Sequence, residues 1–141
     1  MACGLLTYAL NKRAKTLRSD FTILIADRNP RVRDLLKREL MEEGYQILAA
    51  QNDREVLELV TGAGAPALLV LDLAIPYANG IDLVMSLKDK RPDLPIIIHT
   101  LYPEYEWRSL AGAVDAFLQK KGNIDGLKKT IRSVLDKRYP E

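Results

Sequence analysis

The chain has 141 residues, of which 48% are hydrophobic and 28% charged, with one cysteine (Cys3) and a formal net charge of +2. This composition predicts a single globular domain of the reducing cytoplasm and excludes a disulfide framework and a cysteine-based zinc site. No apolar run approaches the roughly 20 residues of a membrane span, and residues 21–141 carry a net charge of −1, which gives no electrostatic case for nucleic acid binding.

Residues 1–20 are set apart from the rest of the chain by their charge of +3. They join an apolar stretch, residues 5–10, to a basic one, which predicts a leader that is either a short amphipathic helix or disordered. A signal sequence is disfavoured, because the charges follow the apolar stretch and no small-residue cleavage site is present. We expect one domain over residues 21–138 and a short tail over 139–141.

From residue 21 onward, strand and helix signals alternate regularly. Apolar runs predict strands over residues 22–26, 46–50, 67–71, 95–100 and 116–120. Between them, helical spacing of apolar residues predicts helices over 30–43, 53–61, 81–88, 104–113 and 123–137. Asn29, as an N-cap before Pro30, begins the first helix and Gly44 ends it; Asn52 or Asp53 caps the second.

Five strand–helix pairs predict an α/β fold with a five-stranded parallel sheet covered by helices on both faces. The doubly wound, flavodoxin-like strand order 2-1-3-4-5 makes the first and third strands neighbours. Asp27 follows the first of these strands and Asp72 follows the third. The order therefore predicts two carboxylates in one crevice at the carboxyl edge of the sheet.

The loops exclude several kinds of chemistry. The segment Asp27-Arg28-Asn29-Pro30 has no glycine, so it cannot cradle a dinucleotide or nucleotide phosphate by close backbone approach. His99 has no serine or cysteine nucleophile to serve, and we interpret it as a strand-end side chain without a catalytic role. A small flavodoxin-like enzyme is disfavoured for these reasons.

The polar residues that remain at the strand ends are Asp27, Asp72 with its following Ile75-Pro76 and Gly80, Thr100, and Lys120. Over residues 21–138 this set resembles the receiver domain of two-component response regulators. The resemblance implies that Asp72 is phosphorylated by a histidine kinase or phosphotransfer protein, and that Lys120 and Thr100 contact the phosphoryl group. It also implies that Thr100 and Phe117 change conformation together when Asp72 is phosphorylated. The only catalysis it implies is phosphoryl transfer to Asp72 and hydrolysis of the resulting aspartyl phosphate.

Arg28 departs from this resemblance, because the family has a second acidic residue there. The resemblance implies Mg²⁺ ligation by Asp27, Asp72 and the backbone carbonyl of Ala74, and Arg28 predicts that this binding is weak. The guanidinium either pairs with the carboxylates or extends into solvent, and the sequence leaves both open. Leu101 and Lys121 are further departures, and Leu101 could narrow access to Asp72.

Two functions are consistent with these residues. The first is a receiver that takes phosphate onto Asp72 and changes a protein-binding face; the alternative is a pseudo-receiver that binds proteins independently of phosphorylation. By the resemblance, a downstream partner or a second copy would use the face from the fourth helix to the closing helix. That face includes Tyr105, Trp107 and Lys120-Lys121. We expect no membrane or nucleic acid partner for this domain.

Overall fold

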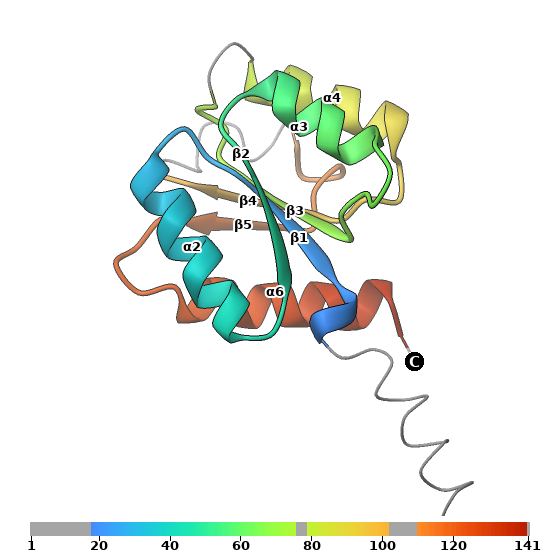
Figure 1. Ribbon diagram of the computed structural model, residues 1–141. Helices are drawn as coiled ribbons and strands as arrows, with labels where there is room; N and C mark the ends of the chain where they lie inside the picture. Colours follow the sequence, from blue (N-terminus) through green and yellow to red (C-terminus); the bar gives the residue numbers. More distant parts are fainter. Residues whose placement is uncertain (1–17, 76–78, 102–109, 141) are drawn as a thin grey trace, which may run out of the picture.

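The fold is a five-stranded parallel sheet in the order β2-β1-β3-β4-β5, in a computed structural model that describes residues 18–75, 79–101 and 110–140 (Figure 1). The strands are β1 (Thr22–Ala26), β2 (Gln46–Ala50), β3 (Leu68–Leu71), β4 (Ile96–Thr100) and β5 (Ala116–Gln119). The helices are α2 (Pro30–Glu42), α3 (Asp53–Thr61), α4 (Gly80–Lys90) and α6 (Asp125–Arg138), preceded by a 3-10 turn, η1 (Arg18–Asp20). The predicted strand order is confirmed, with boundaries within two residues of those expected. Most of the helix expected over 104–113 lies outside the described residues.

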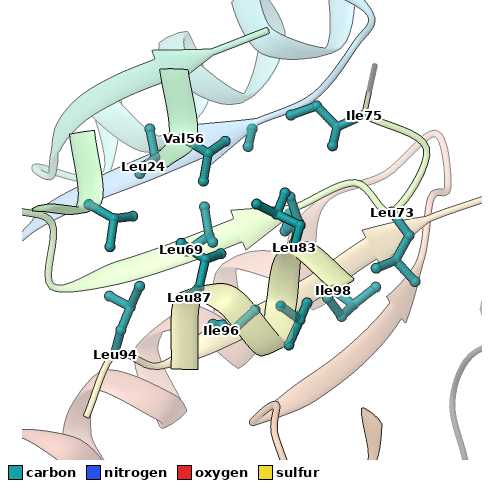
Figure 2. Packing of buried hydrophobic residues seen from close by; sticks show 14 of the residues in the cluster. Leu24, Val56, Leu69, Leu73, Ile75, Leu83, Leu87, Leu94, Ile96 and Ile98 are labelled. Carbon is teal, nitrogen blue, oxygen red and sulfur yellow. The ribbon is translucent and has the colours of Figure 1, made fainter. Parts of the chain in front are cut away.

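The sheet separates two layers of helices (Figure 1). Helices α3 and α4 cover one face, where alternate residues of β1, β3 and β4 such as Leu24, Leu69 and Ile96 pack against them (Figure 2). Helices α2 and α6 cover the other face, against the remaining alternate residues. Because β1, β3 and β4 are covered on both sides, their sequences are continuous apolar runs rather than alternating ones. None of the helices in the described residues has the length and apolar character of a membrane span.

Asparagine side chains begin three of the helices. The Oδ1 of Asn29 accepts from the N–H of Arg31 at 2.9 Å, and that of Asn52 accepts from the N–H of Glu55 at 2.9 Å. Asn79 accepts in the same way from Ile81 at the start of α4. The predicted cap at Asn29 is confirmed, and of the two candidates for α3 the cap is Asn52. These caps satisfy amide groups that the first helical turn leaves unpaired.

Gly80 lies where α4 approaches the loop after β3. A Cβ at this position would be 2.7 Å from the carbonyl oxygen of Leu73 and 3.0 Å from its Cα. Any larger residue would therefore push the two backbones apart. The glycine brings α4 directly against the segment that follows Asp72.

The described ends of the chain pack onto the domain. Arg18 forms an ion pair with Glu43 at 3.0 Å, and its guanidinium lies 6.0 Å from the ring centroid of Tyr45. Tyr139, which the sequence assigns to the tail, stacks obliquely against Phe21 with ring centroids 5.4 Å apart. Contacts among η1, the residue before β1, the α2–β2 turn and the end of α6 therefore cover the amino edge of the sheet, opposite the predicted crevice.

Candidate functional site

Asp27 and Asp72 lie side by side at the carboxyl edge of the sheet. The N–H of Asp72 donates to the carbonyl of Ala26 at 2.8 Å, and the N–H of Asp27 donates to that of Ala50 at 3.2 Å. The parallel pairing of β1 with its neighbours thus continues one residue past each strand. Both carboxylates are buried, with 2% of each residue exposed. The crevice predicted from the strand order is present.

Lys120 bridges the two carboxylates. Its N–H donates to the carbonyl of Thr100 at 2.7 Å, which extends the β4–β5 pairing and brings the lysine to the same edge. Its Nζ lies 2.7 Å from the Oδ2 of Asp27 and 3.1 Å from the Oδ2 of Asp72. Its side chain is 13% exposed, so the ammonium is largely withdrawn from water. One buried cation therefore stabilises two buried anions.

The other carboxylate oxygens also accept hydrogen bonds from the protein. The Oδ1 of Asp27 accepts from the N–H of Asn29 at 2.8 Å. The Oδ1 of Asp72 accepts from the N–H of Ala74 at 3.0 Å and, more distantly, from the Oγ1 of Thr100 at 3.4 Å. All four oxygens thus have a donor, as expected for buried charges that must replace their lost hydration.

Two arginines follow Asp27 and differ in their environment. Arg28 is exposed and forms no ion pair with the carboxylates or other described residues, so of the two orientations left open the structure has the one in solvent. Arg33, in the first turns of α2, donates from Nη1 to the carbonyl oxygen of Asp27 at 2.6 Å. The sequence did not single out Arg33, because its acceptor is a backbone carbonyl, which leaves no signal in the residue pattern.

The oxygen ligands that the described residues offer at the crevice are few. Among residues 18–75, 79–101 and 110–140, no group of three or more histidine, cysteine, aspartate or glutamate side chains is arranged to hold a metal ion. Asp27 and Asp72 are the two acids that the described part of the chain places at the crevice, and Lys120 already pairs with one oxygen of each. Ala74 is exposed two residues beyond Asp72, and its N–H is committed to that carboxylate. A hard divalent cation prefers several oxygen ligands, and here it would share the carboxylate oxygens with Lys120 and the backbone donors.

The residues flanking the crevice on β4 and β5 occupy different environments. Phe117 is half-buried, lies opposite Ile98 in the strand register and packs against the core that α3 and α4 cover. Leu101, which the sequence suggested as an obstruction, is 45% exposed. Pro76, Tyr105 and Trp107 lie outside the described residues.

His99 is buried beneath the crevice, with 5% of the residue exposed. Its Nδ1 is buried and has no hydrogen-bond partner among the described residues. The pKa of the imidazole is lowered from 6.5 to about 4, chiefly by burial and next by the nearby Lys120 ammonium, while Asp27 and Asp72 act in the opposite direction. Near neutral pH the imidazole is therefore uncharged and a weak proton acceptor.

Comparison of the chain with known proteins finds a matching protein family and similar proteins. The family model described as the response regulator receiver domain matches residues 23–132. Response regulator MprA from Mycolicibacterium vanbaalenii is 31% identical over 121 residues, which are 84% of this chain and 52% of MprA. The chain thus spans about half the length of the curated relatives it matches.

Solved structures give the same result. Response regulator TrrA from Thermotoga maritima, in complex with Mg²⁺-BeF, is 35% identical with a TM-score of 0.72, over 82% of this chain and 99% of that one. TrrA in complex with the histidine kinase ThkA matches with the same identity and a TM-score of 0.74, over 82% of this chain and 98% of that one.

Proposed function

The chain belongs to the response regulator receiver domain family, and from that premise we propose that Asp72 accepts a phosphoryl group from a histidine kinase or phosphotransfer protein. The observation that carries the proposal is the contact of Asp72 with both Lys120 and Thr100. TrrA, a similar receiver, has been solved bound to a histidine kinase, which supports a partner of that class. A receiver domain is a signalling module, and the chemistry proposed here is limited to phosphoryl transfer onto Asp72 and hydrolysis of the product.

In the proposed reaction, an oxygen of Asp72 attacks the phosphorus of a phosphohistidine on the donor protein. The new oxygen–phosphorus bond forms as the phosphorus–nitrogen bond breaks, and the imidazole leaves with the bonding electron pair and takes up a proton. Both reactants are anionic, so the reaction needs cations near the transferring oxygens. Lys120 supplies one, because its Nζ lies 3.1 Å from the Oδ2 of Asp72.

Phosphorylation would then redistribute the contacts of Lys120 and Thr100. Phosphorylated Asp72 is an acyl phosphate and no longer carries a free carboxylate, so the ammonium follows the phosphoryl oxygens and the Thr100 hydroxyl donates to one of them. Thr100 and Lys120 are joined through their backbones at 2.7 Å, and Phe117 lies on the same strand as the segment leading into Lys120. Movement of the loop after Thr100 is therefore transmitted to Phe117. From there it reaches the face that the sequence assigns to the helix expected over 104–113, β5 and α6. A downstream partner or a second copy of the chain would bind that face.

Intact mass spectrometry tests the phosphoacceptor directly. After incubation with acetyl phosphate and Mg²⁺, the native chain should gain one phosphoryl mass and Asp72→Asn should gain none. Asp89→Asn, which changes an exposed acid on α4, is the matched control and should label like the native chain. If the native chain stays unlabelled beside a receiver that labels under the same conditions, the domain is a phosphorylation-independent binding module instead.

We also propose that Mg²⁺ binds only weakly through Asp27, Asp72 and the carbonyl of Ala74. The support is Arg28 in place of a third acid, together with the protein donors on all four carboxylate oxygens. Calorimetric titration with Mg²⁺ should show little heat at millimolar concentrations, and Arg28→Asp should strengthen binding. Saturable binding at micromolar Mg²⁺ by the native chain would contradict this proposal. The cytoplasmic location and the domain limits 21–138 stay predictions.

A further inference from the structure

We infer that Arg28 takes the place of a divalent cation, so that the crevice transfers a phosphoryl group to Asp72 without a metal ion. The inference rests on the proposed function of Asp72. It adds that the cations at the transferring oxygens are two side chains, the ammonium of Lys120 and the guanidinium of Arg28. The ligand this site takes is a phosphoryl group free of a coordinated metal.

The formal charge of the crevice is the first argument. Asp27, Asp72 and Lys120 together carry −1, and the exposed Arg28 next to Asp27 brings the local sum to zero. An acid at position 28 would instead make the sum −2, which a divalent cation would neutralise. The arginine therefore changes the local charge by the same amount as a bound Mg²⁺, and an incoming anionic phosphoryl group meets a positive side chain at the mouth of the crevice.

The position of Arg28 is the second argument. It adjoins Asp27, whose Oδ2 shares the Nζ of Lys120 with Asp72. The backbone around it is anchored, since the Asp27 carboxylate accepts from the N–H of Asn29 and its carbonyl accepts from Arg33. The Arg28 side chain itself is exposed and has no ion pair to break among the described residues. It is thus free to bind an anion at the mouth of the crevice, beside the residues that hold Asp72.

The chemistry of the guanidinium is the third argument. Its planar fork donates two parallel hydrogen bonds to phosphoryl oxygens and keeps its charge at every physiological pH. An arginine placed at the transferring oxygens stabilises charge as they separate from the donor. Arg33 cannot take this role while its Nη1 is committed to the carbonyl of Asp27.

The test compares labelling by acetyl phosphate in EDTA and in Mg²⁺, followed by intact mass over time on the full chain. The native chain should label at similar rates in both conditions. Arg28→Asp should lose about 100-fold in rate in EDTA, the scale of removing one charge-stabilising donor, and should recover in Mg²⁺. Arg28→Gln, a neutral change at an exposed position, should be slow in both. Arg31→Gln is the matched control, because Arg31 is also an exposed arginine of this loop and helix start.

A second readout is independent of labelling. Calorimetric titration should show Mg²⁺ binding to Arg28→Asp and not to the native chain or to Arg31→Gln, and circular dichroism should show that all variants are folded. Labelling of the native chain only in Mg²⁺ would overturn the inference and leave the proposed function standing. Labelling of Arg28→Gln in EDTA at the native rate would also overturn it. Absence of labelling in both conditions would overturn the proposed function, and the inference with it.

Discussion

Replacing Lys120 by methionine should destabilise the domain. The substitution keeps the aliphatic stem and removes only the ammonium that lies 2.7 Å from Asp27 and 3.1 Å from Asp72. Both carboxylates are 2% exposed, so water cannot replace the lost cation. Two buried like charges then face each other without compensation.

The expected loss of stability can be estimated in two ways. Removing one partner of a buried ion pair costs about 3–5 kcal/mol. Two like charges a few ångströms apart repel by roughly 3–4 kcal/mol at an effective dielectric constant of about 20. These describe the same repulsion and do not add, so we expect the free energy of unfolding to fall by about 3 kcal/mol at pH 7.5.

A second substitution tests whether repulsion between the two carboxylates causes the loss of stability. Adding Asp72→Asn to Lys120→Met removes one of the two charges and should restore most of the loss at pH 7.5.

Urea denaturation at pH 7.5, followed by circular dichroism, measures these differences in stability. Lys121→Met is the matched control: this neighbouring lysine is exposed, and its loss should change stability by less than about 0.5 kcal/mol. The reasoning would be refuted by a deficit below about 1 kcal/mol at pH 7.5, or by a double variant no more stable than Lys120→Met.

Three other substitutions test the surroundings of the crevice and the base of the sheet. The pKa of His99 is near 6.5 in the unfolded chain and about 4 in the folded one, so the contribution of His99 to the free energy of unfolding falls by about 2 kcal/mol between pH 7.5 and 5. His99→Leu should therefore make the urea midpoint depend less on pH over that range, and an unchanged pH dependence would contradict this. Gly80→Ala should lower the free energy of unfolding by about 2 kcal/mol and slow the labelling of Asp72, because the new Cβ would meet the Leu73 carbonyl. Gly126→Ala is the control: there is open space around this glycine, and the variant should be as stable as the native chain. Tyr139→Phe loses a 2.9 Å hydrogen bond to a carbonyl before β3 and should lower stability by about 1 kcal/mol in thermal denaturation; no change would show that the contact contributes nothing.

The sequence alone determined the fold and the core of the candidate site. The apolar runs that become β1, β3 and β4 are buried on both faces, so composition identified them without any periodicity. Asn29 as the cap of α2 was predictable because a cap is a contact between residues two or three apart. Asp27 and Asp72 could be paired because the strand order follows from alternation, and parallel strands end at the same edge.

The tertiary structure alone decided how the charges in that site are balanced. Lys120 contacts Asp72 across 48 residues of sequence and reaches Asp27 as well. Its bridging of both depends on how the sheet places the ends of β1, β3 and β5 relative to one another. The solvent orientation of Arg28 and the bond from Arg33 to a backbone carbonyl likewise follow from packing, because long side chains have many rotamers and carbonyls are common to all residues. Local patterns specify elements that form over a few residues, while the energies of buried charges depend on neighbours that only the folded chain brings together.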